Sequence, residues 1–188
     1  MRVISLNVGE VRTILWEGRE VRTGFQKRPV HGKVALRGVN LEGDDQADRT
    51  VHGGTGKTIY VYPSEHYPYW RKELERRSLD WGAFGENLTT SGWLESTAHL
   101  GDVVRIGTAT LEITQPRRPC YKLNAIFARP DMVERFHRSG RSGFYLGPVS
   151  EGEMGEGDPI ELLSRKADAP SISDILEAER KDDPTTRT

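Results

Sequence analysis

A cysteine in a basic, proline-containing segment is the residue of this sequence that points most directly to chemistry. Cys120 is the single cysteine among 188 residues, and it lies in the segment Gln-Pro-Arg-Arg-Pro-Cys-Tyr-Lys. Arg117, Arg118 and Lys122 are within three residues of its sulfur, and positive neighbours stabilise a thiolate over a thiol. A thiolate ligates soft metals and attacks electrophiles. Because two prolines stiffen the segment, we predict that Cys120 ends a rigid loop and is reactive rather than inert.

A glycine-rich segment, Gly53–Thr58, resembles the end of a phosphate-binding P-loop. The earlier glycine that this pattern requires is missing, since Val51 and His52 precede the segment. A P-loop also opens a helix, whereas the β-branched and aromatic run Thr58–Tyr62 is typical of a strand. We therefore exclude a nucleoside triphosphatase. The glycines are expected either to let the backbone approach an anionic ligand or to form a tight turn.

Three histidines are further candidates for metal binding or catalysis. His52, His66 and, more weakly, His31 could form a zinc site together with Cys120 and Glu65. Their spacing matches no compact zinc motif, and a lone histidine in a polar loop is more often a hydrogen-bonding residue. A catalytic Cys–His pair stays open, because proximity in space cannot be derived from this spacing.

The segment Phe84–Thr89 places a carboxylate and an amide between a glycine and a leucine. Glu86 and Asn87 can present these polar groups to a pterin-like ring. A local turn stabilised by the Asn87 side chain is an equally good interpretation of the same residues.

The elements that position these residues are mainly short strands. Apolar alternation and β-branched runs, separated by Gly, Asp and Pro, are typical of a barrel or a barrel-like sandwich. Strands and helices do not alternate regularly, which excludes a doubly wound nucleotide fold. The predicted strands are Val3–Val8, Val11–Leu15, Lys33–Leu36, Thr58–Tyr62, Val103–Ile106, Thr110–Thr114 and Phe144–Val149.

Three helices accompany the strands. Ser64 is predicted to cap a helix over residues 65–77, and Asp131 a helix over residues 132–138 that ends near Gly140. A third helix is expected over residues 172–181, before a disordered tail. The fold is thus predicted to be mainly β with flanking helices, an α+β barrel. Residues 1–166 would form the barrel domain and residues 167–188 a short C-terminal helix and tail.

The composition limits the classes of function. The net charge is −1, so no overall field attracts a nucleic-acid polymer or a membrane, and any anion site must be local. A lone cysteine excludes an internal disulfide and a multi-cysteine metal centre, and a free thiol favours the cytoplasm. No signal peptide or membrane-spanning run is present in the sequence.

Taken together, these segments resemble the MOSC domain, the C-terminal domain of molybdenum-cofactor sulfurases, and in particular its stand-alone bacterial YiiM-like branch. Each segment is weakly specific alone, but their combination and order are highly specific up to about Arg165. The segments that carry the resemblance are residues 41–48, Val51–Gly54, Tyr62–Tyr67, Phe84–Leu88 and Gln115–Leu123.

The resemblance implies a MOSC-type β-barrel with flanking helices and a key cysteine, which maps onto Cys120. In one group of relatives the cysteine ligates the molybdenum of a pterin cofactor that reduces N-hydroxylated compounds, including hydroxylamino purines. In another group it relays sulfur as a persulfide. We predict the reductase, which needs a small-molecule substrate and an electron-donating reductase. It is expected to be cytoplasmic and to form a homodimer. The alternatives are a non-catalytic cofactor or sulfur carrier and a plain β-barrel interaction module.

Roles for individual residues follow from this resemblance and from charge. Four cationic side chains are expected to hold the cofactor phosphate, those of Arg49, Lys57, Arg117 and Arg118. His52 and Asn87 are expected to hydrogen-bond the pterin or the substrate. Mitochondrial relatives have an arginine where this chain has Glu86, and the C-terminal helical tail is shorter than in YiiM-like proteins. Lys27 and Lys72 are expected to be distant surface residues. The predicted site comprises Cys120 and His52 for catalysis, Cys120 as metal ligand, and Arg49, Gly53, Gly54, Lys57, Glu86, Asn87, Arg117 and Arg118 for the cofactor.

Overall fold

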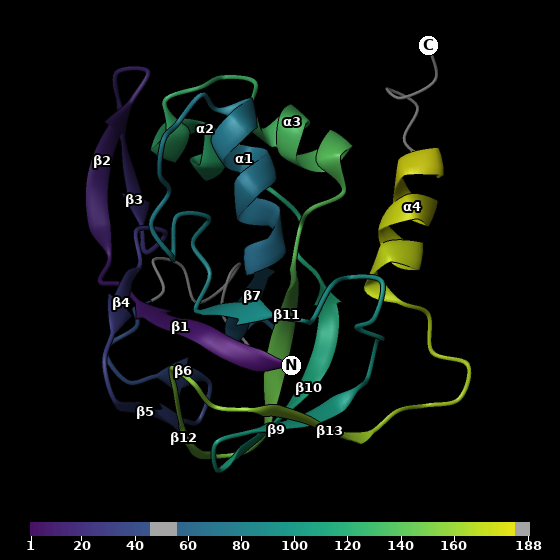
Figure 1. The fold of residues 1–188 in the computed structure, drawn as a ribbon. Helices are drawn as coiled ribbons and strands as arrows, with labels where there is room; N and C mark the ends of the chain where they lie inside the picture. The colour runs from purple at the N-terminus through teal and green to yellow at the C-terminus, as the bar shows by residue number, and fades with distance from the viewer. Residues whose placement is uncertain (46–55, 183–188) are drawn as a thin grey trace.

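Eight hydrogen-bonded strands form the central sheet of the molecule (Figure 1). The computed structural model describes residues 1–45 and 56–182. Neighbouring strands run antiparallel, except for β7 and β8, which are parallel. In order across the sheet the strands are β13 (Ile160–Ser164), β9 (Val103–Ile106), β10 (Ala109–Pro116), β11 (Phe144–Ser150), β7 (Ile59–Pro63), β8 (Leu88–Ser91), β1 (Arg2–Val8) and β4 (Arg28–Val30).

Two smaller sheets flank this centre. One pairs β12 (Gly152–Gly155), β5 (Lys33–Arg37) and β6 (Asn40–Leu41), and the other is the hairpin of β2 (Arg12–Trp16) and β3 (Arg19–Thr23). The hairpin turn has φ of 50° at Glu17 and 75° at Gly18. Two consecutive positive values match the right-handed twist of paired strands, which explains how a connection of two residues joins β2 to β3.

The sheet curls but does not close into the predicted barrel. Its edge strands, β13 and β4, do not pair with each other in the described part of the chain. Hydrogen bonds from Val3 N to Asp158 O and from Ile160 N to Met1 O, both 2.9 Å, join the start of β1 to the segment around β13. At the other edge, Pro29 lacks an N–H group and ends the ladder. The predicted mainly β class with flanking helices is confirmed, whereas full closure is not.

The helices differ in detail from the prediction. They are η1 (Ser64–His66), α1 (Tyr67–Glu73), α2 (Lys122–Phe127), α3 (Met132–Ser139) and α4 (Ile172–Asp182). The helix predicted over residues 65–77 is formed by η1 and α1 and ends earlier, at Glu73. The chain cannot continue the helix through Glu75, which has a φ of 53°. Ser64 is the first residue of η1 and not its N-cap, which is Pro63, and its hydroxyl donates to Glu65 (3.3 Å). Asp131 is the N-cap of α3 but makes no capping hydrogen bond, and its carboxylate accepts from Arg135 (2.6 Å).

Two packed regions hold these elements together. An aliphatic core lies within the curled sheet, and Ile172 and Leu176 of α4 belong to it. A second, aromatic cluster lies between β7 and the helices α1, α2 and α3, which gather at one end of the sheet (Figure 1). In the described part of the chain, no helix is long and apolar enough to cross a membrane. The predicted disordered tail, residues 183–188, lies outside the described residues.

Candidate functional site

A pocket of about 180 Å³ lies beside the cysteine loop, where the ends of several elements meet. The end of β10, the segment after β3 and the segment before β8 all contribute to its wall. The loop that carries the cysteine joins β10 to α2, as the prolines predicted. Five of the predicted site residues line the pocket, namely Lys57, Asn87, Arg117, Arg118 and Cys120.

Cys120 is held at the wall of this pocket by the backbone on both sides. Its carbonyl oxygen accepts a hydrogen bond from Leu123 N (2.9 Å), which sets the start of α2. On the other side, Arg117 N donates to Gly143 O (3.1 Å). The cysteine is partly buried and unbridged, so its sulfur borders a cavity that a ligand can enter.

Arg117 is a buried cation that forms no ion pair with the other described residues. Its side chain is 4% exposed, and its guanidinium carbon lies 5.0 Å, 5.2 Å and 5.8 Å from the ring centres of Phe136, Tyr60 and Phe25. Among the described residues, its Nη1 atom has no hydrogen-bond partner. A buried charged donor is costly to leave unsatisfied, so the pocket is suited to an anionic ligand.

The tyrosines beside Arg117 do not neutralise it. Burial raises the pKa of Tyr60 well above its ordinary value, and burial likewise raises the pKa of Tyr145, although Arg117 opposes both shifts. Both phenols therefore keep their protons at neutral pH. Neither phenol therefore balances the positive charge of Arg117.

A buried ion pair forms another part of the pocket wall. The ammonium group of Lys27 donates to the carboxylate of Asp44, and both side chains are almost fully buried. Asp44 also accepts hydrogen bonds from Gly9 N (2.9 Å) and from the amide of Asn87 (2.8 Å). Burial lowers the pKa of Lys27, and Asp44 opposes this shift. The expectation that Lys27 is a distant surface residue is wrong, whereas Lys72 is exposed as expected.

Asn87 lines the pocket, but its amide is engaged within the protein. Its Nδ2 atom donates to Asp44, and its Oδ1 atom accepts from Tyr60 N (3.1 Å). Through these two hydrogen bonds the Asn87 side chain links β7 to the loop that carries Asp44. It shapes the pocket wall while leaving little hydrogen-bonding capacity for a ligand.

Glu86 is not placed to contact a ligand in this pocket. It is fully buried and is absent from the pocket wall. Its carboxylate accepts hydrogen bonds from the hydroxyl of Tyr67, from Gly82 N (2.9 Å), from Phe84 N (3.1 Å) and from the hydroxyl of Thr89 (2.8 Å). Its predicted role in cofactor binding is thus corrected: the acceptor holds the loop before β8 in shape.

Removing this acceptor should destabilise the fold. Glu86→Ala is expected to lower the free energy of unfolding by at least about 3 kcal/mol, since several buried donors lose their acceptor and each costs about 1–3 kcal/mol. Urea unfolding followed by circular dichroism measures this change. Glu177→Ala, at an exposed position of α4, is the matched control and should stay within about 0.5 kcal/mol of the unmodified chain. Equal stability of the two variants would contradict the assignment.

The remaining predicted residues divide into two groups. Arg118 lies at the pocket edge and forms an ion pair with Glu179 of α4, while Lys57 lines the wall after the glycine-rich segment. Residues 59–63 beyond that segment form a strand, which agrees with the exclusion of a P-loop. Four predicted residues lie outside the described part of the chain: Arg49, His52, Gly53 and Gly54.

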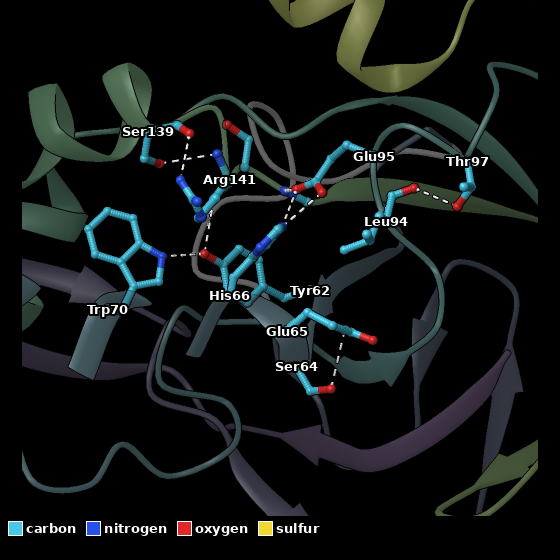
Figure 2. A network of polar contacts seen from close by, with 12 residues as sticks. Tyr62, Ser64, Glu65, His66, Trp70, Leu94, Glu95, Thr97, Ser139 and Arg141 are labelled. Atoms are coloured by element: carbon cyan, nitrogen blue, oxygen red, sulfur yellow. Dashed lines mark hydrogen bonds and ion pairs between the residues drawn. The ribbon is translucent and has the colours of Figure 1, made fainter. Parts of the chain in front are cut away.

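Of the three histidines, His31 and His66 lie in the described residues and form no metal centre there, whereas His52 lies outside them. His66 Nε2 contacts the Glu95 carboxylate at 2.8 Å and 3.0 Å, and Glu95 also accepts from Gly143 N (2.7 Å) (Figure 2). His31 is exposed. In residues 1–45 and 56–182, no group of three or more His, Cys, Asp or Glu side chains is placed to hold a metal ion. His66 therefore has a structural role beside Tyr62 and the turn before β11.

Several pocket residues were missed by sequence reasoning. They come from four separate parts of the chain, and no local motif marks them. Of the segments that carry the family resemblance, only the acidic segment 41–48 contains one of the missed residues, Asp44. The residues that were missed are Phe25, Lys27, Asp44, Tyr60 and Tyr145.

Sequence comparison with known proteins shows the family to which the chain belongs. Residues 48–161 match the family model described as MOSC domain. Over 163 residues the chain is 44% identical to the uncharacterized protein YflK of Bacillus subtilis, covering 87% of this chain and 73% of that protein. A protein named Reductase from Gibberella moniliformis is 36% identical over 151 residues, which are 79% of this chain and 27% of that protein.

A solved structure gives the same result for the fold. The crystal structure of YiiM from Geobacillus stearothermophilus superposes with a TM-score of 0.78 and 36% sequence identity. The match covers 98% of this chain and 87% of that chain. The similarity therefore includes the sheet, the helices and the loop that carries Cys120.

Proposed function

Because the chain belongs to the MOSC domain family, we propose that it binds a molybdenum–pterin cofactor in the pocket beside Cys120 and reduces N-hydroxylated bases such as hydroxylamino purines. The observation that carries this proposal is the buried guanidinium of Arg117, whose Nη1 atom has no hydrogen-bond partner among the described residues, in the same pocket wall as the lone cysteine. The relative named Reductase supports an oxidoreductase, although this chain spans only 27% of its length.

The described residues fit such a cofactor. Cys120 offers a soft sulfur ligand, which suits a thiophilic metal. Arg117 offers a buried donor that is suited to a phosphate oxygen, and the cationic side chains of Lys57 and Arg118 border the same pocket. The ion pair of Arg118 with Glu179 is exposed, so it contributes little and can be exchanged for an anionic ligand.

The cofactor, when bound, would supply the electron pair that breaks the N–O bond of the substrate. The reaction consumes two electrons and two protons, and it converts the hydroxylamino group to an amino group and water. Tyr145 keeps its phenolic proton because burial raises its pKa. It can therefore donate a hydrogen bond to the substrate oxygen. Phe25, Tyr60 and Phe84 provide an apolar wall that limits access of water.

A sulfur carrier is the alternative, because a cysteine can also take up sulfane sulfur from a donor persulfide and hold it as a persulfide. Cofactor-loaded protein with a chemical electron donor should convert 6-hydroxylaminopurine to adenine, and chromatography measures the product. A carrier should show Cys120 with the mass of one added sulfur, removable by a reductant. Stoichiometric persulfide, without turnover by loaded protein under a strong reductant, would replace the reductase with the carrier.

A further inference from the structure

A second groove adjoins the cofactor pocket and shares two of its residues. This groove has a volume of about 730 Å³ and lies between β4, the segment after α1 and the end of α2. Phe25 and Lys27 line both the groove and the pocket. A molecule bound in the groove therefore lies directly against the wall of the cofactor pocket.

Two arginines at this groove form no ion pair with any of the described residues. The guanidinium carbon of Arg76 lies 5.5 Å from the ring centre of Phe127, and this contact orients the group while leaving its in-plane N–H donors available. Arg28 is exposed on the edge strand β4. Within residues 1–45 and 56–182, neither arginine forms an ion pair, and the groove contains a single carboxylate, that of Asp80. The groove is therefore suited to a doubly charged anion such as a phosphate monoester.

Aromatic side chains line the same groove. Trp81 is partly exposed there, and its ring is held edge-on against Tyr67 with centres 4.5 Å apart. Phe25 approaches the backbone of Gly85, where a Cβ atom would lie 3.0 Å from its ring; Gly85 also has a φ of 81°, so both features favour glycine. Rigid, partly exposed rings bind the faces of nucleobases.

We propose that this groove binds the sugar and 5′-phosphate of a purine nucleotide, so that the substrates of the enzyme are N-hydroxylated purine nucleotides rather than free bases alone. This inference rests on the proposed reductase function. The phosphate of the nucleotide lies at Arg28 and Arg76, and its purine ring lies along Trp81 and Phe25. The shared position of Phe25 then directs the hydroxylamino end of the base toward Cys120.

Binding of an unreactive analogue tests the groove without any turnover. Titration calorimetry of the full chain with adenosine 5′-monophosphate should show binding at least about tenfold tighter than with adenosine, because the phosphate adds charge-assisted hydrogen bonds. Arg76→Gln and Arg28→Gln should each weaken binding of the monophosphate about tenfold and change binding of adenosine by less than about twofold. Arg77→Gln is the matched control, since Arg77 is exposed next to Arg76 but does not line the groove.

The outcomes separate this inference from the proposed function. Equal affinities for adenosine and its monophosphate overturn the inference, as does inorganic phosphate that binds as tightly as the monophosphate. Reduction of free 6-hydroxylaminopurine by a chain that does not bind the monophosphate also overturns it and leaves the reductase in place. Arginine-dependent binding by a cofactor-loaded chain that reduces neither form supports the nucleotide site and instead removes the reductase.

Discussion

Replacement of Cys120 by serine should abolish molybdenum retention and reductase activity while the fold persists. Serine is nearly isosteric with cysteine, but its hydroxyl is a poor ligand for a soft metal. Loss of an outer-shell contact already costs about 10–100-fold in metal affinity or activity, so loss of the ligand should cost at least about 100-fold. Elemental analysis and turnover measure these effects, and thermal unfolding reports the fold.

A neighbouring substitution provides the control for this result. Tyr121 follows the cysteine and is 56% exposed, so Tyr121→Phe perturbs the same loop without changing the sulfur. This variant should retain metal and turnover. If Cys120→Ser retained full molybdenum and full turnover, the cysteine would not be the ligand and the proposed role would be wrong.

Loss of the charge at Arg117 should produce the second large effect. Arg117→Gln removes the buried guanidinium whose Nη1 has no partner in the described part of the chain. A charge-assisted hydrogen bond contributes about 1.5–3 kcal/mol, so affinity for the cofactor should fall by about 10–150-fold. Pterin content after gel filtration at increasing dilution measures the retention.

Two further variants make this prediction specific. Arg117→Lys keeps the charge but loses the planar, bidentate donor geometry, and its retention should lie between those of the unmodified chain and Arg117→Gln. Arg71→Gln removes an exposed arginine of α1 and should leave retention unchanged, because exposed distant charges are screened. Equal retention in Arg117→Gln and Arg71→Gln, with both folded, would show that Arg117 does not hold the cofactor.

The sequence predicted the elements that have a strong local signal. All seven predicted strands are present, each within two residues of the expected bounds. Alternating hydrophobicity or a run of β-branched and aromatic residues marks them in the sequence. The other strands of the described chain were missed, namely β3, β4, β6, β8, β12 and β13. Of these, β4 contains Pro29, and β6 has two residues. Helix α2 was also missed, since its six residues are too few to show a helical period.

The candidate site was predicted where one loop carries it and was missed where the fold assembles it. Cys120, Arg117 and Arg118 lie in one basic loop, so charge and spacing marked them together. Lys27 and Asp44 pair across 17 residues of sequence, and the two residues lack a shared motif. A buried lysine next to an arginine in sequence is indistinguishable from a surface lysine until the fold shows its partner. Glu86 was assigned to the ligand because its local sequence does not reveal the backbone donors that surround it.

The molybdenum and pterin content of the purified chain tests the central claim most directly. Protein from cells that make the cofactor should contain molybdenum and pterin in equal amounts, approaching one of each per chain, and both should be lost together in Cys120→Ser and Arg117→Gln. Elemental analysis and fluorescence of the oxidised pterin measure the two contents on the same sample. Protein that folds and is purified from such cells with neither molybdenum nor pterin, and that takes up neither when they are supplied, would contradict the account.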